Sequence, residues 1–212
     1  SSVSYTLSAN VENITLSGTS SGVNATGNAL ANVLTGNSGT NVLTGGAGDD
    51  TYVVTTGDTT TELANEGIDT VMSAVAWTLA PNVENLTLTG TGSVAGTGNA
   101  LNNVLTGNSG TNALTGLAGD DTYFVTTGDT TVEAANEGID TVMAGVTWTL
   151  ANNVENLTLT GTGLINGTGN PADNVLTGNS AANVLTGGAG NDTYVVGTGD
   201  TVTEAAGAGT DT

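Results

Sequence analysis

A long internal repeat constrains this chain more than any other feature. The segment Asn82–Gly90 (NVENLTLTG) returns 71 residues later as Asn153–Gly161, and a close variant occupies Asn10–Gly18. The chain therefore divides into three copies, at residues 1–72, 73–143 and 144–212. Repeats of this kind stack on their neighbours and share a core, so we expect one continuous structure rather than three separate domains.

A shorter period of nine residues lies inside the long one. Three consecutive blocks show it in the first copy: Gly27–Thr35, Gly36–Thr44 and Gly45–Val53. Each block is a glycine-rich turn followed by a short β-branched run, and glycine supplies the positive φ that such turns need. Leu34, Leu43 and Tyr52 hold the same place in successive blocks, so we expect them to point inward and fill a thin core.

The pattern favours strands throughout. Leucine and threonine alternate in Leu86–Thr89, and helical periodicity is absent. We therefore predict an all-β fold, a right-handed parallel β-solenoid (β-roll) in which two blocks form one coil of about 18 residues. Four coils in each long repeat, stacked at about 4.8 Å, would give a rod roughly 55–60 Å long.

The composition excludes several functions. The chain has no Lys, Arg, His or Cys, and its 20 acidic residues give a formal net charge of −20. Nucleic-acid binding and attraction to anionic membranes both need basic side chains. Histidine bases, thiolates, Schiff bases and zinc sites are absent as well. No stretch of apolar residues is long enough to cross a membrane, so we expect no membrane insertion.

Carboxylates alone remain as candidate catalytic groups. A glycosidase built on two of them would also need a cleft with aromatic side chains that stack on the substrate. The aromatic residues instead fall into two equally spaced columns: Tyr5, Trp77 and Trp148, and Tyr52, Tyr123 and Tyr194. Equal spacing favours stacking in the core, so we predict that the chain is not an enzyme.

One nonapeptide in each copy carries recognisable chemistry. Gly45–Val53 (GGAGDDTYV) and Gly187–Val195 fit the pattern G-G-x-G-x-D-x-U-x, where U is a large apolar residue, and Gly116–Phe124 has Leu117 in place of the second glycine. With the flanking blocks, essentially the whole chain resembles the long-repeat, secreted bacterial type of the RTX, or haemolysin-type calcium-binding repeat, family. The resemblance implies a parallel β-roll, Ca²⁺ held between successive turns, and a secreted or cell-surface location.

The acidic residues are consistent with this implication. One coil after Asp50 the chain reaches Glu66 and Asp69. Carboxylates stacked at coil spacing repel one another unless a cation lies between them, and Ca²⁺ prefers such hard oxygen ligands together with backbone carbonyls. The candidate calcium ligands are Gly46, Gly48, Asp49, Asp50, Glu66 and Asp69 in the first copy, Gly119, Asp120, Asp121, Glu137 and Asp140 in the second, and Gly190, Asp192 and Asp211 in the third.

Two features limit the expected amount of calcium. In the third copy Asn191 and Ala208 replace an aspartate and a glutamate, which weakens that site. In the two blocks before each acidic one, asparagine stands where the family pattern has aspartate: Asn32, Asn41, Asn103, Asn112, Asn174 and Asn183. A neutral amide is a weak Ca²⁺ ligand, so we predict metal-free asparagine ladders there and one or two ions per long repeat.

The roles of two further sets of carboxylates stay open. Asp58, Asp129 and Asp200 are each followed four residues later by a glutamate: Glu62, Glu133 and Glu204. They form either a second calcium site at the opposite corner or solvated turns. A third set, which we expect to bond turn amides, comprises Glu12, Glu84 and Glu155.

These observations favour a structural, calcium-stabilised rod in a filament, surface layer or adhesin stalk. The alternative is an ice-binding or ligand-binding region of an RTX adhesin, since Thr15, Thr87 and Thr158 recur on the face opposite the leucines. The chain starts and stops in nearly the same repeat phase, so we expect it to associate with itself, head to tail or laterally through exposed valines.

Overall fold

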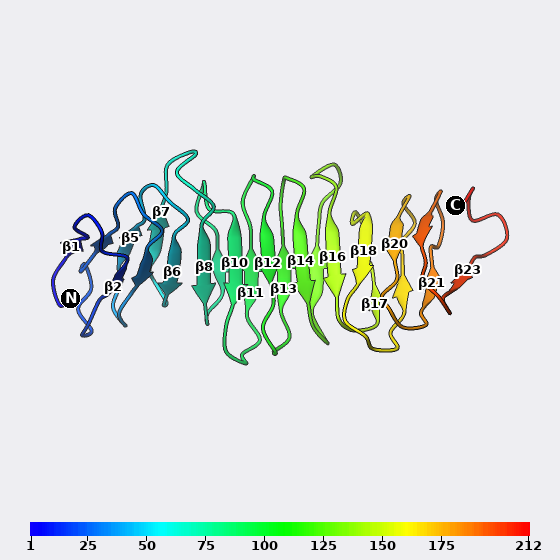
Figure 1. The fold of residues 1–212 in the computed structure, drawn as a ribbon, viewed down its shortest axis with the longest axis horizontal. Helices are drawn as coiled ribbons and strands as arrows, with labels where there is room; N and C mark the ends of the chain where they lie inside the picture. Colours follow the sequence, from blue (N-terminus) through cyan, green and yellow to red (C-terminus); the bar gives the residue numbers. More distant parts are fainter.

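The computed structural model describes residues 1–212 as a single rod made of strands and turns (Figure 1). All strand pairs are parallel, and each coil places one strand on either side of a thin core. The predicted all-β parallel solenoid is therefore confirmed. No helix is present that could cross a bilayer.

One side of the rod is a continuous sheet of eleven strands. In order along the rod they are β2 (Asn13–Thr15), β4 (Val33–Thr35), β6 (Thr51–Val54), β8 (Thr70–Ser73), β10 (Asn85–Leu88), β12 (Val104–Thr106), β14 (Thr122–Val125), β16 (Thr141–Ala144), β18 (Asn156–Leu159), β20 (Val175–Thr177) and β22 (Thr193–Val195). We call it the long sheet. At about 4.8 Å per strand it is roughly 50 Å long.

The other side is divided into three four-stranded sheets, which we call the short sheets. The first contains β1 (Tyr5–Thr6), β3 (Ala25–Thr26), β5 (Val42–Thr44) and β7 (Thr59–Thr61). The second contains β9 (Trp77–Thr78), β11 (Ala95–Thr97), β13 (Ala113–Thr115) and β15 (Thr130–Val132). The third contains β17 (Trp148–Thr149), β19 (Gly167–Thr168), β21 (Val184–Thr186) and β23 (Thr201–Thr203). We call the two breaks, between β7 and β9 and between β15 and β17, the seams.

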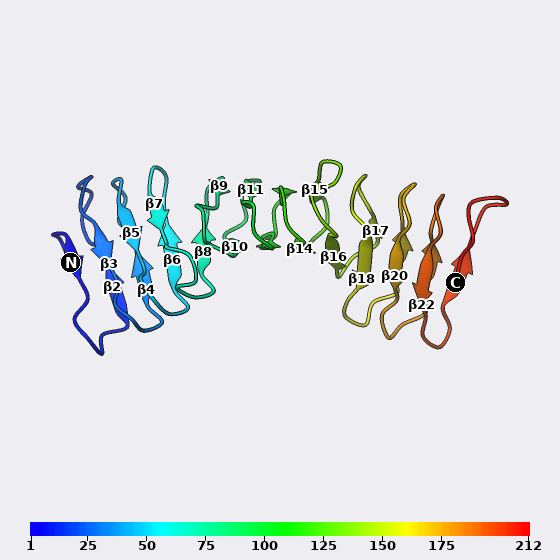
Figure 2. The same cartoon turned by 90° about the horizontal axis from the view of Figure 1, so that it is seen from above.

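Coil length explains the seams. Equivalent corners lie 18 residues apart between Asn103 and Asp121 and 19 between Asp121 and Asp140, but only 15 between Asp140 and Glu155. The shorter coil still pairs β16 with β18 on the long sheet, yet β15 and β17 stay unpaired. The rod also twists about its long axis, so its end coils are seen broader than its central coils in Figure 2.

The core is a file of apolar side chains, one layer per coil. Leu34, Leu43 and Tyr52 are fully buried, which confirms their predicted inward orientation. At the seams the inward residue is tryptophan. Trp77 pairs in register with Gly96, where a Cβ would lie 2.9 Å from Leu86 Cδ2, so the small residue makes room beside the large one.

The aromatic columns are core residues with one exception. Tyr123 is fully buried and Trp148 is 8% exposed, as expected for core stacking. The prediction is wrong for Tyr5, which is 48% exposed. Tyr5 lies on β1, the outermost strand of its sheet, so no coil covers its other side.

Candidate metal centre

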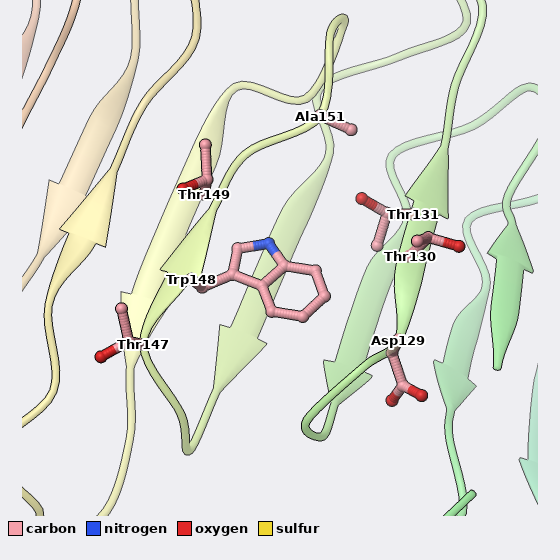
Figure 3. A pocket seen from close by; sticks show the side chains of 7 residues that line it. All are labelled: Asp129, Thr130, Thr131, Thr147, Trp148, Thr149 and Ala151. Atoms are coloured by element: carbon pink, nitrogen blue, oxygen red, sulfur yellow. The ribbon is translucent and has the colours of Figure 1, made fainter. Parts of the chain in front are cut away.

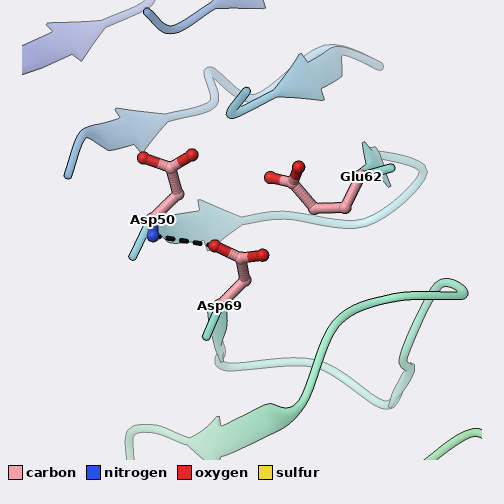
Figure 4. Close-up of side chains that lie close together, drawn as sticks. All are labelled: Asp50, Glu62 and Asp69. Atoms are coloured by element: carbon pink, nitrogen blue, oxygen red, sulfur yellow. Dashed lines mark hydrogen bonds between the residues drawn. The ribbon is translucent and has the colours of Figure 1, made fainter. Parts of the chain in front are cut away.

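Two clusters of three carboxylates lie inside the rod, at equivalent places in the first and second long repeats. We call them the carboxylate clusters: Asp50, Glu62 and Asp69, and Asp121, Glu133 and Asp140. All six side chains are buried, and the ligand oxygens within each cluster lie within 4.8 Å of one another. Figure 4 shows how the first three converge from separate segments.

The strands determine how these side chains meet. Asp121 directly precedes β14 and Asp140 directly precedes β16, so the two stack at one corner of successive coils. Glu133 directly follows β15 on the opposite side of the rod. Side chains alternate along a strand, so Thr131 and Glu133 both point inward, and Glu133 reaches back toward Asp121.

A ladder of hydrogen bonds fixes the corner. The backbone N–H of Asn103 donates to Asp121 Oδ1 at 2.6 Å, and the N–H of Asp121 donates to Asp140 Oδ1 at 2.9 Å. The N–H of Asp140 in turn donates to Glu155 Oε2 at 2.8 Å. Each coil therefore receives an acceptor from the following coil, which satisfies a buried backbone donor. The expected structural role of Glu155 and Glu84 as acceptors for turn amides is confirmed.

The remaining oxygens of the clusters have no such partners. Buried carboxylate oxygens without a hydrogen bond in the two clusters are Asp50 Oδ2, Glu62 Oε2, Asp121 Oδ2, Glu133 Oε2 and Asp140 Oδ2. No lysine, arginine or histidine exists in the chain to pair with them. Buried polar groups are almost always paired, so two repeated sets of unpaired carboxylate oxygens are suited to binding a cation or protons.

Glycine and tyrosine complete the surroundings of each cluster. A Cβ on Gly116 would overlap Asp121 Oδ2, Glu133 Oε1 and the Tyr123 hydroxyl, and Gly45 has the same neighbours in the first repeat. The Tyr123 hydroxyl donates a hydrogen bond to Glu133 Oε1. Because glycine has no side chain, Gly116 leaves room for these carboxylate and hydroxyl oxygens.

Burial makes the ionised clusters costly. Desolvation, with added repulsion from neighbouring carboxylates, raises the pKa of Asp121 to about 7, of Glu133 to about 8 and of Asp140 to about 6. The same causes raise the pKa of Asp50, Glu62 and Asp69 to about 7, 8 and 6. Either protons or a cation would relieve this repulsion, and a divalent ion does so while the carboxylates stay ionised.

The structure groups the predicted ligands differently from the sequence. Asp50 and Asp69 lie together, but the third member of the cluster is Glu62 rather than Glu66. Glu66 Oε2 instead accepts the N–H of Leu63 in the outer turn, at 3.0 Å. Glu137 and Asp120 are placed likewise, accepting from Ala134 and Ile139.

The remaining predicted residues lie in the turn itself. Asp49 is exposed, and its Oδ1 accepts the N–H of Ile68 at 2.9 Å. Gly46 and Gly48 have φ of 98° and 111°, as expected for a turn that needs glycine. The N–H groups of Gly48, Gly119 and Gly190 each donate to a carbonyl one coil further on.

Leu117 occupies the place of Gly46 in the second repeat and adopts a φ of 75°. The left-handed conformation costs a leucine about 1–2 kcal/mol of conformational free energy. The second turn is therefore strained where the first is not.

Sequence reasoning missed Glu62 and Glu133 as members of the clusters. It counted one coil forward from Asp50 along the same corner, whereas Glu62 comes from the opposite side of the rod. A signal was present in the alternation of β7, which places Thr60 and Glu62 inward, in line with Gly45 one coil earlier. A glycine that lies one coil before an inward-pointing glutamate leaves room for the glutamate's carboxylate.

The third long repeat has a looser arrangement. Asp192 is buried, burial raises its pKa, and its N–H donates to Asp211 Oδ1 at 3.0 Å. Tyr194 donates to Glu204, as Tyr123 does to Glu133. Glu204 and Asp211 are only partly buried, and the three carboxylates do not form a cluster like the other two.

The asparagines of the predicted ladders bond mostly to backbone, and four of them also donate to a second asparagine side chain in the same turn. Asn112 Oδ1 accepts the N–H of Asn108 at 2.8 Å, and its side-chain amide donates to the Val94 carbonyl of the preceding coil at 2.9 Å. Asn103 makes equivalent bonds to Asn99 and Glu84. These amides join turns through the backbone, and the absence of metal at these positions stays a prediction.

The aspartates at the opposite corner are neither solvated nor free. Asp129 is 6% exposed; its Oδ1 accepts the N–H of Asn112 and its Oδ2 accepts the N–H of Thr126. Asp58 makes the same bonds to Asn41 and Thr55. Both oxygens are used, which identifies these residues as structural acceptors.

The chemistry of the carboxylate clusters suits a hard divalent cation. Six to eight oxygen ligands at 2.3–2.6 Å are typical of Ca²⁺, and Asp121, Glu133 and Asp140 supply carboxylate oxygens from three segments. No thiolate or imidazole is available for a softer metal. The clusters therefore fit calcium.

Comparison with known proteins agrees. The family model for the RTX calcium-binding nonapeptide repeat (4 copies) matches residues 26–60, 97–132 and 168–202. No curated protein and no solved structure matches the chain. The three matched segments make up half of the chain and contain the nonapeptides, the turns and the structural aspartates described above. The chain thus belongs to the RTX calcium-binding nonapeptide repeat family.

Proposed function

We propose that this chain is a calcium-stabilised structural rod of a secreted or cell-surface protein, and that it is not an enzyme. The observation that carries the proposal is the pair of buried carboxylate clusters, in each of which at least two oxygens lack partners in a chain without basic side chains. One ion would be held by Asp50, Glu62 and Asp69, and another by Asp121, Glu133 and Asp140. RTX repeat proteins are generally secreted, which supports the location.

The outer turn is a second, weaker candidate for each of the first two repeats. Its ligands would be the carbonyls near Gly46 and Gly48 with the free carboxylate oxygens of Asp49 and Glu66, and the equivalent residues of the second turn are Gly119, Asp120 and Glu137. Because these carboxylates are more exposed and already accept backbone N–H groups, we expect lower affinity there.

The test is calcium removal. At neutral pH and low salt the metal-free chain should lose most of its β-type circular dichroism, since 20 carboxylates repel one another and metal binding is linked to folding. Millimolar Ca²⁺ should restore the signal, whereas an equal ionic strength of NaCl should not. Identical spectra in EDTA and in Ca²⁺ would contradict a calcium-stabilised rod.

We further propose that rods associate with themselves, end to end or side by side, into a filament, surface layer or stalk. The outer strands β2 and β22 of the long sheet each have a neighbouring strand on one side only. Ser1 and Thr212 bond to part of the other edge, and the rest of that edge could pair with another strand. Sedimentation with and without Ca²⁺, followed by electron microscopy, tests this. A strict monomer at tens of micromolar chain with Ca²⁺ would argue for an internal spacer.

A second function is favoured by the outer face of the short sheets. Threonines there stack in register across consecutive coils: Thr26, Thr44 and Thr61, then Thr78, Thr97 and Thr115, then Thr149, Thr168, Thr186 and Thr203. A regular, uncharged threonine file suits an ice-binding or ligand-binding region of an adhesin. A thermal-hysteresis assay separates this function from a purely structural rod.

A further inference from the structure

Each seam opens a groove on the short-sheet side of the rod. The groove of the second seam is lined by Thr130 and Thr131 of β15 and by Trp148 and Thr149 of β17, with Asp129, Thr147 and Ala151 at its margins (Figure 3). The groove of the first seam has the equivalent lining from Thr59, Thr60, Trp77 and Thr78. Their volumes are about 290 and 380 Å³. The same groove is therefore built twice, in the same repeat phase.

Both grooves contain buried polar groups that have no partner. Trp148 is 8% exposed and Thr131 is 5% exposed, yet neither Trp148 Nε1 nor Thr131 Oγ1 makes a hydrogen bond. The same atoms of Trp77 and Thr60 are unpartnered in the first groove. Figure 3 shows the indole of Trp148 lying across the seam, with its benzene edge toward Thr131. The indole N–H and the hydroxyl are unpaired at both seams and belong to residues that line the grooves, so a ligand that reaches them would supply the partners that they lack.

The lining also defines the chemistry of that ligand. The one carboxylate, Asp129, accepts backbone N–H groups with both oxygens, so both oxygens are held in the turn. No basic side chain exists to bind an anion. What remains is a set of threonine hydroxyls beside an aromatic ring, a combination that suits a neutral molecule with both hydroxyl and C–H edges.

We propose that each seam groove binds a neutral sugar ring. The hydroxyls of Thr130, Thr131 and Thr149 would bond to sugar hydroxyls, and the indole would supply its N–H and an apolar edge. The groove volumes lie near the lower end of those known for ligand pockets, which fits one or two rings. This site is separate from the carboxylate clusters and would add carbohydrate binding to a calcium-stabilised rod.

Tryptophan fluorescence provides a direct readout, because the only two tryptophans of the chain are Trp77 and Trp148. The calcium-loaded chain is titrated with D-glucose, N-acetyl-D-glucosamine and their β-1,4-linked hexasaccharides, and calorimetry gives the stoichiometry. We expect a saturable change in emission and two sites per chain. Binding of the monosaccharides would identify free sugar as sufficient, and binding of the hexasaccharides alone would identify a polysaccharide.

Thr131→Val keeps the shape of the side chain and removes its hydroxyl, so it should weaken the second groove at least tenfold and leave one tight site. Thr115→Val, on the outer face of β13 away from either groove, is the matched control and should leave two. Circular dichroism in the same calcium buffer shows whether each variant is folded. It therefore distinguishes a failure of the sugar-binding proposal from a failure of the proposal that calcium stabilises the rod. No saturable emission change in the folded chain, or equal binding by Thr131→Val and Thr115→Val, would overturn the proposal.

Discussion

Two buried aspartates of one coil, Asp121 and Asp129, are held in the rod by the same kind of hydrogen bond. They differ in whether their second carboxylate oxygen has a partner. In each, Oδ1 accepts the backbone N–H of an asparagine on the preceding coil, at 2.6 Å for Asp121 and 2.8 Å for Asp129. The second oxygen of Asp129 accepts the N–H of Thr126 at 2.7 Å. The second oxygen of Asp121 has no partner and faces Glu133 and Asp140.

The comparison shows what distinguishes a structural acidic residue from a metal ligand in this fold. Burial does not, because both aspartates are buried, and neither does the ladder bond, which both make. The difference is whether the turn supplies a donor for the second oxygen. Both aspartates directly precede a strand, but Asp129 Oδ2 receives the N–H of Thr126 from a tight turn three residues back, whereas no donor reaches Asp121 Oδ2.

The largest effect should come from filling the space beside Asp121. Gly116→Ala places a Cβ against Asp121 Oδ2, Glu133 Oε1 and the Tyr123 hydroxyl, so the second cluster should lose its ion and the folded chain about 1–3 kcal/mol from overpacking. Calcium stoichiometry by calorimetry should fall by one. Gly92→Ala, where the nearest atom is Val94 Cγ1 at 3.9 Å, is the control, and equal stoichiometry in both variants would contradict this account.

Exchanging each aspartate for its amide tests the comparison directly. Asp121→Asn removes the charge but keeps the ladder acceptor, so the bound calcium and its stabilising effect should fall. Asp129→Asn should keep the calcium stoichiometry and lose about 1–3 kcal/mol of stability in Ca²⁺, since the amide turns a donor toward the N–H of Thr126. Thermal melts with and without Ca²⁺ measure both. Similar calcium loss in the two variants would mean that both corners bind metal.

A smaller effect should separate the two glutamates of the same loop. Glu133→Gln neutralises a buried member of the cluster and should weaken calcium binding, by an amount that calorimetry measures. Glu137→Gln leaves an acceptor for the N–H of Ala134 in an exposed turn and should change affinity little. A stronger effect at Glu137 would favour the outer turn as the principal site.

The smallest effect is a dependence on pH in the metal-free chain. Burial raises the pKa of Asp121 to about 7 and of Glu133 to about 8, above the usual values of 3.8 and 4.5. A raised carboxyl pKa means that the folded state binds protons more tightly than the unfolded state, so this stabilisation is complete below about pH 4 and is lost as the pH rises through 7 and 8. The β-type circular dichroism of the chain in EDTA should therefore increase as the pH is lowered from 8.5 to 5.5. A signal that does not change with pH would mean that Asp121 and Glu133 have ordinary pKa values and are in contact with water.

Much of the fold was predictable from the sequence because each nonapeptide carries its own turn and its own inward residue. Leu34, Leu43 and Tyr52 are buried as their spacing predicts. The seams were not predictable in this way, since an equal count of four coils per repeat conceals one coil of 15 residues among longer ones. Only the strand register shows that the short coil keeps β16 paired with β18 and leaves β15 unpaired with β17.

The candidate site was predictable in part for a similar reason. Asp50 and Asp69 follow one another along a corner, and counting residues along the chain finds that pair. Glu62 meets them across the core, through the space that Gly45 leaves open. Contacts across the interior depend on side-chain direction and on the neighbour one coil away, and neither is visible in a residue count.

The seams give the rod a mechanical asymmetry. Bending that stretches the long sheet must break hydrogen bonds between consecutive strands, whereas bending that widens a seam breaks none between β7 and β9 or between β15 and β17. The rod should therefore resist bending that stretches the long sheet and bend more easily in the direction that widens the seams, which recur every four coils. Under a sideways load it should flex at the seams, beside Trp77 and Trp148.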